Sequence, residues 1–485
     1  MPISTIAFEH GVYTTELPTP IIPMTSVTEP VVALGTAPLH LAQNPAPPNT
    51  PILCSSLSEF VNQFGWHDDF DKFTLCEVAR CHFTIYNVAP VVFINVLNPT
   101  VHAVTTTLEF DGIAGSMKLS LNQPVLLDSV KITSGEGDDL ITFAADDFTV
   151  TRDGEGALIE INSPDKVIDN NVSVTFRELD PSAVTSQNVI GGVDLTTGAN
   201  LGLEVLEDVY PKLGVVPGSV IAPKFSTDSA VAQVMASKCN GINGCFKAIA
   251  IADLPTSTVR KYTDVTAVKT GNNFVDQRLI VCWPKVTLGG EQYHLSTQLA
   301  ALMCTVDAAR DNIPFKSPSN ETLKVDGACL SDGTAIYLGR DLANYINGQG
   351  VFTALNFGGW RSWGVYSSAY PVDTDPINFV SVKRMMSWLS NNLILNFFNQ
   401  IDNPQNRVLV DTVLDSVRIW LNGLAARGAI LGGSDIAFLE TDNPLSELTQ
   451  GHMVFRLSIG FVVPAKKIEF TLQFDPNLYS SLFES

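Results

Sequence analysis

The sequence has little positive charge for its length. Lysine and arginine together number 29 in 485 residues, against 50 aspartates and glutamates, so the formal net charge is −21. A nucleic-acid partner requires a basic surface, and this balance argues against one. Long apolar runs are also missing. None reaches the ~20 residues of a membrane-spanning helix, and the start MPISTIAFEHG lacks the basic and apolar regions of a secretory signal. We therefore expect no direct membrane insertion.

Cysteine is sparse and is not arranged in a metal-binding pattern. The eight cysteines are spread through the chain, and the spacings Cys76-x4-Cys81 and Cys239-x5-Cys245 match no zinc signature. Cys81 stands next to His82, which would suit a thiol nucleophile, but no third partner is identifiable. Most of the cysteines have apolar neighbours, so we interpret them as buried, reduced thiols.

Other groups of polar residues and glycines also fail to form a known site. His67 with Asp68, Asp69 and Asp71 lacks the order of a calcium loop, and a solvated loop explains it better. The glycines at 191–192 and 214–218 do not end in the Gly-Lys-Ser/Thr of a phosphate loop. The segment 357–364, rich in glycine and tryptophan, is better explained by close backbone packing than by a ligand cradle. We expect no catalytic residue, no metal and no cofactor.

Apolar material is plentiful, at 45% of the residues, and the length favours about three domains. Nearly continuous apolar runs predict buried strands over 31–38, 88–99, 245–255 and 278–284. Ser56-x-x-Glu59 forms a capping box that predicts a helix over 56–64. Strands that alternate with helices indicate an α/β core with a mostly parallel sheet.

Between residues 100 and 181 the pattern changes to short alternating segments separated by turn residues. This spacing predicts an inserted β-sandwich of immunoglobulin-like size. The segment holds 15 acidic and 5 basic residues, which amounts to −10 of the chain's −21. We expect this insert to face solvent in any assembly.

The last quarter of the chain predicts two amphipathic helices and a terminal strand. Apolar residues at helical spacing cover 382–397 and 410–424, with Asn403-Pro404 as the expected start of the second helix. In the terminal strand Ile468, Phe470, Leu472 and Phe474 share one face.

Residues 381–427 carry a net charge of +2 within an acidic chain. The five cations are Lys383, Arg384, Arg407, Arg418 and Arg427. Ordinary solvated helix faces and a basic surface matched to an acidic partner are equally compatible with this composition.

The chain resembles the contractile tail sheath proteins of myophages and phage-tail-like bacteriocins over most of its length. The resemblance rests on FEHGVYTTELPTPIIP near the start, on LGVVPGSVIAP and IADLP in the middle, and above all on INFVSVKRMMSWL, NPQNRVLVDTVLDSVRIWLNGLAARGAILGG, DNPL and KKIEFTLQFD. The family often has a basic residue directly after Trp-Gly, whereas Val365 and Tyr366 follow here, so no role is transferred to that position.

The resemblance implies a mixed α/β, multidomain structural subunit rather than an enzyme. Such subunits polymerise around a tail tube as a helical stack of hexameric rings. They then contract to drive the tube through the host envelope for genome ejection. Implied partners are further copies of the chain, the tube protein, and the baseplate and tail terminator proteins. The implied location is the virion tail, after assembly in the host cytoplasm. A bacteriocin or secretion-type system is the alternative, and an α/β hydrolase-like or nucleotide-binding enzyme is the alternative from another class.

The resemblance and the composition together give a predicted domain plan. It consists of an N-terminal arm (1–24), an α/β core (25–99 with 182–340), the β-sandwich insert (100–181), a tube-facing C-terminal domain (341–465) and a C-terminal arm (466–485). We expect the arms to pair with neighbouring subunits through strands, because an alternating strand at a chain end offers unpaired backbone groups. The predicted arm contacts are Val12, Thr14, Glu16, Ile468, Phe470, Leu472 and Phe474. The predicted tube contacts are the five cations of residues 381–427.

Overall fold

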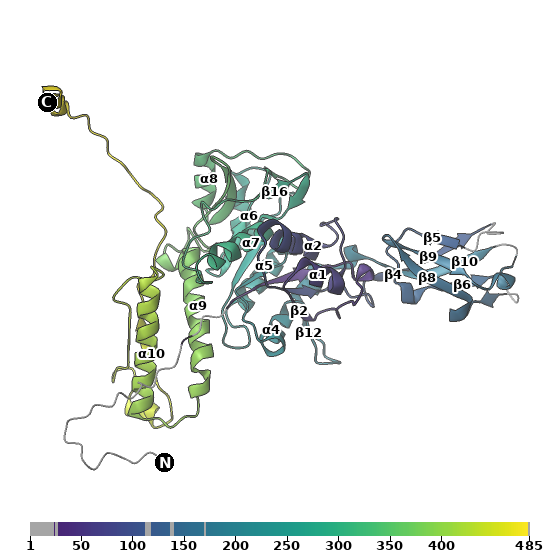
Figure 1. Ribbon diagram of the computed structural model, residues 1–485, viewed down its shortest axis with the longest axis horizontal. Helices are drawn as coiled ribbons and strands as arrows, with labels where there is room; N and C mark the ends of the chain where they lie inside the picture. Colours follow the sequence, from purple (N-terminus) through teal and green to yellow (C-terminus); the bar gives the residue numbers. More distant parts are fainter. Residues whose placement is uncertain (1–23, 25–27, 112–117, 136–139, 169–170, 484–485) are drawn as a thin grey trace, which may run out of the picture. The chain divides into compact units, whose positions relative to one another are not determined.

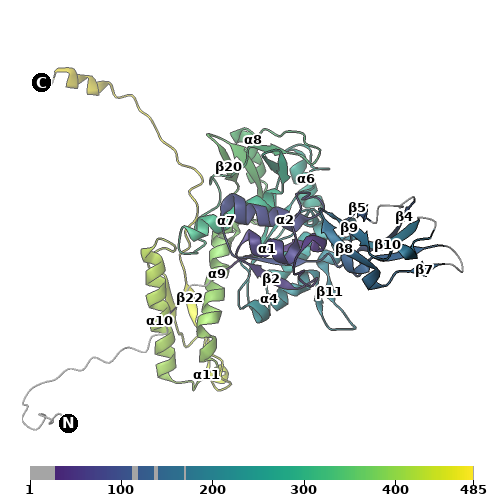
Figure 2. The same ribbon diagram turned by 45° about the vertical axis from the view of Figure 1, so that its right-hand side comes forward.

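A computed structural model describes residues 24, 28–111, 118–135, 140–168 and 171–483 of the chain. It divides into two compact units, one containing 392–462 and the other containing 27–391 together with 463–485. Val12, Thr14 and Glu16, and with them the predicted N-terminal arm contacts, lie outside the described residues. Figures 1 and 2 give two views of the chain.

An eight-stranded sheet forms the centre of the larger unit. In spatial order its strands are β2 (Pro51–Cys54), β3 (Val91–Asn95), β1 (Val31–Gly35), β13 (Ser219–Ile221), β14 (Ile249–Asp253), β15 (Leu279–Cys282), β19 (Val351–Asn356) and β20 (Trp360–Trp363). The six inner strands run parallel, and β2 and β20 pair antiparallel at the two edges. Four of these strands fall in the predicted apolar runs, and the α/β class is confirmed.

Helices and a small sheet pack around this sheet (Figures 1 and 2). They are α1 (Leu57–Phe64), α2 (Thr74–Ala79), α3 (Ser186–Ile190), α4 (Leu206–Leu213), α5 (Ser229–Lys238), α6 (Asp264–Gly271), α7 (Leu295–Ala308) and α8 (Arg340–Asn347), with the strands β16 (Lys285–Leu288), β17 (Glu291–Tyr293) and β18 (Gly327–Cys329). A short hairpin joins β11 (Gly192–Val193) and β12 (Asn200–Leu201). The predicted cap of α1 is present: the Ser56 side chain accepts from the Glu59 backbone N–H, and the Glu59 carboxylate accepts from the backbone N–H of Ser55.

The described residues between 103 and 179 form two antiparallel sheets that share one apolar core. One sheet has the order β4 (Ala103–Phe110), β10 (Val172–Leu179), β6 (Lys131–Ser134), β7 (Ile141–Thr142), and the other β5 (Lys118–Leu121), β9 (Gly156–Ile161), β8 (Phe148–Asp153). Val174 and Phe176 of the first sheet and Leu121 and Ile159 of the second are buried in this core. Ala103 and Leu179 are register partners, so the segment enters and leaves at adjacent positions.

The aromatic–glycine segment 357–364 contains the turn between β19 and β20, the strand β20 itself and Gly364. A Cβ atom at Gly364, directly after β20, would lie 2.5 Å from the ring of Phe352, so only glycine fits against this ring. The interpretation as a close-packed site is therefore confirmed at this glycine. Both strands belong to the large sheet, so the sheet extends past the predicted domain boundary at residue 341.

The smaller unit holds the end of α9 (Val380–Phe397), α10 (Arg407–Ala426), α11 (Leu445–Leu448) and a two-stranded sheet of β21 (Asp435–Ala437) and β22 (Arg456–Ser458). The predicted apolar face of α10 is confirmed, since Val410, Val413, Leu414, Val417, Leu421 and Leu424 are all buried. The first three turns of α9, by contrast, are buried nearly all round rather than on one face.

The predicted start of α10 at Asn403-Pro404 is wrong. Asn406 caps the helix, and its side chain accepts from the Leu409 backbone N–H at 2.9 Å. The Asn403 amide instead donates to the Asn399 carbonyl, at the end of the preceding helix. The helix therefore begins three residues later than predicted, at Arg407.

Candidate assembly surfaces

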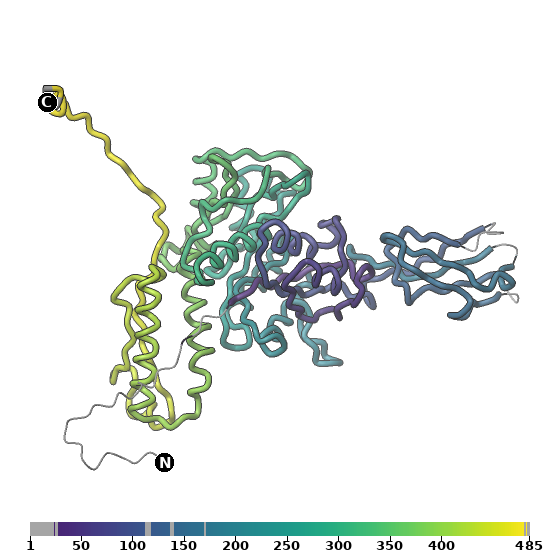
Figure 3. Tube along the Cα trace, viewed as in Figure 1, coloured from purple at the N-terminus to yellow at the C-terminus, as the bar shows by residue number. Residues whose placement is uncertain are grey.

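The C-terminal segment presents an apolar face to solvent. Ile468, Phe470, Leu472 and Phe474 are 72–96% exposed. Residues 463–475 have no helix or strand (Figure 3), and no described residue forms a hydrogen bond with the backbone of residues 467–474. The last described residues form a short 3-10 helix, Pro476–Phe483. A segment with four exposed apolar side chains and unused backbone groups is suited to a strand that pairs with another chain.

At the start of this segment, Lys466 contacts aromatic rings of the larger unit. The ammonium of Lys466 lies 5.0 Å from the ring centroid of Tyr366 and 5.7 Å from that of Phe379, and it donates to the Tyr366 hydroxyl. The Tyr366 ring stacks on Tyr370 and on Phe379. Beyond Lys466 the recorded ion pair and ring contact join residues of the segment to one another, Lys467 with Glu469 and Phe474 with Tyr479. Lys466 therefore marks where the exposed segment begins.

Glu29 ties the residues that lead into β1 to helix α9. The Asn391 amide donates to the Glu29 carboxyl at 2.7 Å and to the Lys247 carbonyl at 2.8 Å, and its oxygen accepts from the Lys247 backbone N–H. One asparagine thus joins three segments of the chain. Burial raises the pKa of Glu29 to about 8, against the smaller opposing effects of Asn391 and Arg384. The carboxyl group is therefore largely uncharged at neutral pH.

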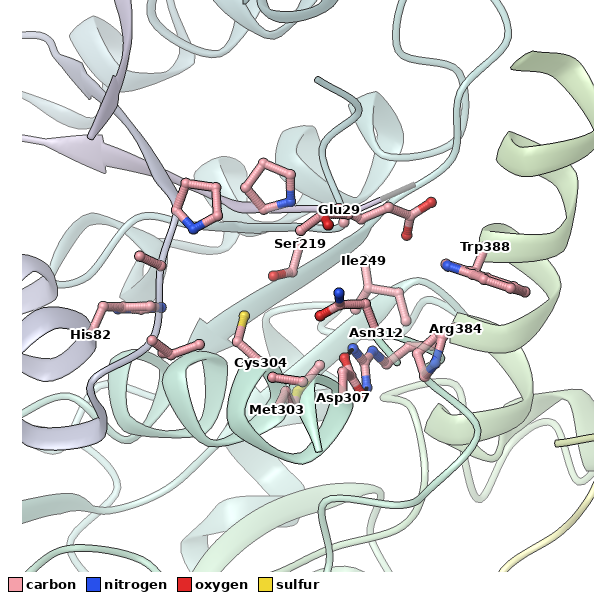
Figure 4. A pocket seen from close by; sticks show the side chains of 18 of the residues that line it. Glu29, His82, Ser219, Ile249, Met303, Cys304, Asp307, Asn312, Arg384 and Trp388 are labelled. Carbon is pink, nitrogen blue, oxygen red and sulfur yellow. Dashed lines mark hydrogen bonds and ion pairs between the residues drawn. The ribbon is translucent and has the colours of Figure 1, made fainter. Parts of the chain in front are cut away.

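A cavity of about 60 Å³ adjoins Glu29 (Figure 4). Arg384 of α9 pairs across it with Asp307 of α7, and both side chains are nearly buried. Cys304 and His82 also line it. Burial raises the pKa of the Cys304 thiol to about 12 and lowers the pKa of His82 to about 4, so the thiol stays protonated and the imidazole neutral. These groups have the properties of packed structural residues rather than of a nucleophile and its base.

The five predicted tube-contact cations separate into two groups. Lys383 is 8% exposed and donates to Gln277, while Arg384 is paired with Asp307, so neither side chain lies on an exposed helix face. The prediction that Lys383 and Arg384 lie on a surface is therefore wrong, because other parts of the core cover this part of α9. Arg407, Arg418 and Arg427 are exposed on α10 or at its end. Arg407 pairs with Asp411 and Arg418 with Asp435, both at 2.9 Å.

The groups that could have indicated an enzyme or a metal site have other roles. Burial raises the pKa of Cys81 well above the usual range for a thiol. His67 accepts from the Asp69 backbone N–H and pairs with Glu155. Six of the eight cysteines are buried, as expected. In the described ranges no three or more His, Cys, Asp or Glu side chains are grouped so that they could hold a metal ion. Nor does any helix there have the length and apolar character needed to cross a membrane.

Two contacts at these surfaces were not predicted from the sequence. Glu29 stands two residues before an apolar strand, and Asn391 lies 362 residues later, so no local pattern links them. The sequence predicts Lys466 only as the first residue of the C-terminal arm, and its aromatic partners lie about a hundred residues earlier. No pattern in the sequence signalled the second contact.

Comparisons with known proteins place these surfaces in context. No family model matches the chain. Among curated proteins it is 29% identical to a tail sheath protein of Burkholderia phage BcepMu, over 95% of both chains. It is 26% identical to a prophage major tail sheath protein, described as putative, of Pseudomonas aeruginosa UCBPP-PA14, over 62% of this chain and 76% of that one.

Solved structures show the same fold. The chain is similar to a subunit of the sheath complex of an extracellular contractile injection system in its contracted state, with a TM-score of 0.59, 13% identity and coverage of 98% and 99% of the two chains. It is also similar to the sheath tail protein of Desulfitobacterium hafniense, with a TM-score of 0.52, 11% identity and coverage of 89% and 94%. The resemblance seen in the sequence is confirmed: the chain is similar to a phage tail sheath protein over nearly its whole length and has the fold of solved sheath subunits. These relatives support the prediction of a structural protein rather than an enzyme.

Proposed function

We propose that this chain polymerises around a tail tube as a helical stack of hexameric rings and contracts to drive the tube through a host envelope. The observation that carries the proposal is the C-terminal segment, whose four apolar side chains remain exposed in the single chain. Burial of apolar area at ~25 cal/mol per Å² favours any neighbour that covers them. A sheath also explains why a subunit would keep such a segment exposed before assembly.

The smaller unit offers a matching partner for this segment. Its two-stranded sheet of β21 and β22 leaves one edge of each strand without a strand partner in the described chain. An added strand from a second copy would use backbone groups on both sides and give the sheet more than its marginal two strands. Because the donor and acceptor surfaces differ, the contact is head-to-tail, and repetition of such a contact builds a helix or a ring.

The remaining features of the domain plan fit the same assembly. The tube-facing surface would include Arg407, Arg418 and Arg427, opposite an acidic tube. Exposed pairs contribute only ~0.2–1 kcal/mol each, so contacts of this kind hold through their number and release readily. The acidic insert would face outward. Partners would be further copies, the tube, the baseplate and the tail terminator, with assembly in the host cytoplasm and a place in the virion tail. A bacteriocin or secretion-type sheath remains the alternative.

Electron microscopy of the concentrated protein tests the proposal. The full chain should form tubes or rings, and deletion of residues 466–485 should leave a folded subunit that forms neither. The double variant Phe470→Asp, Leu472→Asp should behave like the deletion. Its matched control, Glu469→Ala with Gln473→Ala, changes the opposite face of the same segment and should assemble. Normal tubes from the aspartate variant would refute the role of this segment.

A deletion variant tests the outward position of the insert. The chain with residues 103–179 replaced by a short Gly-Ser linker should fold and assemble, because the two ends of the segment are paired neighbours. A folded variant that does not polymerise would show that the insert takes part in subunit contacts.

A further inference from the structure

A polar pocket of about 460 Å³ lies in the larger unit, away from the cavity beside Glu29. Its walls come from α5, from the loop that precedes β15 and from α9. The charged and hydroxyl side chains of the wall are Arg278, Lys383, Asp276 and Ser237. The side-chain amides in the wall are those of Gln233, Asn240, Asn273 and Gln277. The pocket thus combines neutral polar groups with two cations.

Both cations are buried without an ion pair among the described residues. Arg278 is 9% exposed and Lys383 is 8% exposed. No carboxylate oxygen of a described residue lies within ion-pair distance of either. Burial lowers the pKa of each, and the nearby Arg278 lowers that of Lys383 further. Buried charges are normally paired, because an isolated charge loses its hydration without compensation.

Each cation also keeps hydrogen-bond donors that the described part of the protein does not use. Arg278 donates through Nε to Asn240 and through Nη1 to the Ala248 carbonyl and to Ser387, which leaves Nη2 without a partner among the described residues. Lys383 donates once, to the Gln277 side chain, and an ammonium has three donors. The unused donors fit a group with several acceptor oxygens.

The acidic neighbours do not neutralise this pair. Asp276 lines the pocket, but one of its oxygens accepts from the Arg278 backbone N–H. Asp373 lies near Lys383 and accepts from Gln277. Asp276 raises the pKa of both cations and Asp373 raises that of Lys383, so these carboxylates offset part of the cost of burial, although neither forms an ion pair with them.

We propose that Arg278 and Lys383 form a binding site for an oxyanion, a carboxylate or a phosphate, in this pocket. The ligand would take donors from both cations and supply the missing negative charge. Two sources have this chemistry: a free anion such as inorganic phosphate, or an acidic side chain of a second copy of this strongly acidic chain. Binding of a free anion does not depend on the proposed sheath assembly, whereas binding of a second copy's carboxylate rests on it.

Thermal unfolding of the full-length subunit, at a concentration below assembly, tests the site with sodium phosphate and sodium acetate as probes. Sodium chloride at equal ionic strength is the reference. The unfolding temperature should rise saturably with phosphate or acetate beyond the effect of chloride. Lys383→Gln should weaken this response about tenfold, as expected for the loss of a charge-assisted hydrogen bond. Lys247→Gln is the matched control, since Lys247 lies nearby but does not line the pocket, and it should respond like the parent chain.

A second variant keeps the test decisive if Lys383→Gln does not fold. Ser237→Glu places a carboxylate on the exposed wall of the pocket, and it should raise the unfolding temperature and abolish the phosphate response. The absence of a specific anion effect in the parent chain would overturn the proposal, and so would an equal loss in the Lys383 and Lys247 variants. Phosphate that also slows tube assembly would identify a neighbour's carboxylate as the source, whereas unchanged assembly would identify a free anion.

Discussion

Strand β10 and the C-terminal segment 467–474 have the same alternation of apolar and polar residues but opposite surroundings. In β10 the side chains of Val172, Val174 and Phe176 are buried between two sheets, and the strand is bonded to β4 on one side and β6 on the other. In the C-terminal segment the equivalent face is 72–96% exposed. Alternation therefore specifies which face is apolar, while the partner that covers this face can belong to the same chain or to another.

The largest expected effect is a difference in folding stability between variants of strand β10 and variants of the C-terminal segment. Phe176→Ala should destabilise the insert by ~3–5 kcal/mol, because it removes a fully buried ring and leaves a cavity. Phe470→Ala should change the free energy of unfolding of the isolated subunit by less than ~0.5 kcal/mol, since the ring is exposed. Calorimetry of both variants checks the contrast. A large loss of stability in the Phe470 variant would mean that the segment packs on its own subunit.

The same contrast applies to the cations of α9 and α10. Arg384→Met leaves Asp307 buried without its partner and should cost about 3–5 kcal/mol of folding stability. Arg418→Met breaks an exposed pair with Asp435 and should change the folding stability far less, because solvent screens this pair. Chemical denaturation of the two variants measures the difference. Equal, small effects would place Arg384 at a surface and restore it as a tube-contact candidate.

The sequence predicted elements well where a local pattern decides them. The parallel strands, the cap at Ser56 and the apolar face of α10 follow from residues close together in the chain. Lys383 and Arg384 could not be predicted in the same way, because Gln277 and Asp307 lie 106 and 77 residues away and cover them only in the folded chain. The C-terminal segment was predicted as a strand from its alternation, and its partner strand stays a prediction.

A third contrast concerns pH at the segment that leads into β1. The pKa of Glu29 is raised from 4.5 to about 8, so the folded chain holds a proton that the unfolded chain has lost between these values. The contribution of the Glu29 carboxyl to the free energy of unfolding is therefore fully present below pH 4.5, and it falls as the pH rises towards about 8. Glu29→Gln should remove this part of the slope and be more stable than the parent chain at about pH 8. Unfolding free energies measured between these two pH values check it, and an unchanged slope would contradict the burial of this carboxyl.

The smallest expected effect concerns Lys466, at the start of the C-terminal segment. Lys466→Met removes the contact with the rings of Tyr366 and Phe379 and should cost ~0.5–1 kcal/mol locally, without a change in the global unfolding free energy. Lys467→Met, one residue further along, is the matched control. Limited proteolysis at residues 463–467 should be faster in the Lys466 variant alone. Equal cleavage of both variants would show that the contact of Lys466 with the rings does not fix the start of the segment.

Hydrogen exchange of residues 467–474, compared between the free subunit and assembled tubes, tests the central claim most directly. The account predicts fast, unprotected exchange in the free subunit, because no described residue bonds to this backbone, and strong protection in the tube. Residues of β10 serve as the internal reference and should be protected in both states. Protection of 467–474 in the free subunit, or its absence in the assembled tube, would contradict a strand shared between subunits.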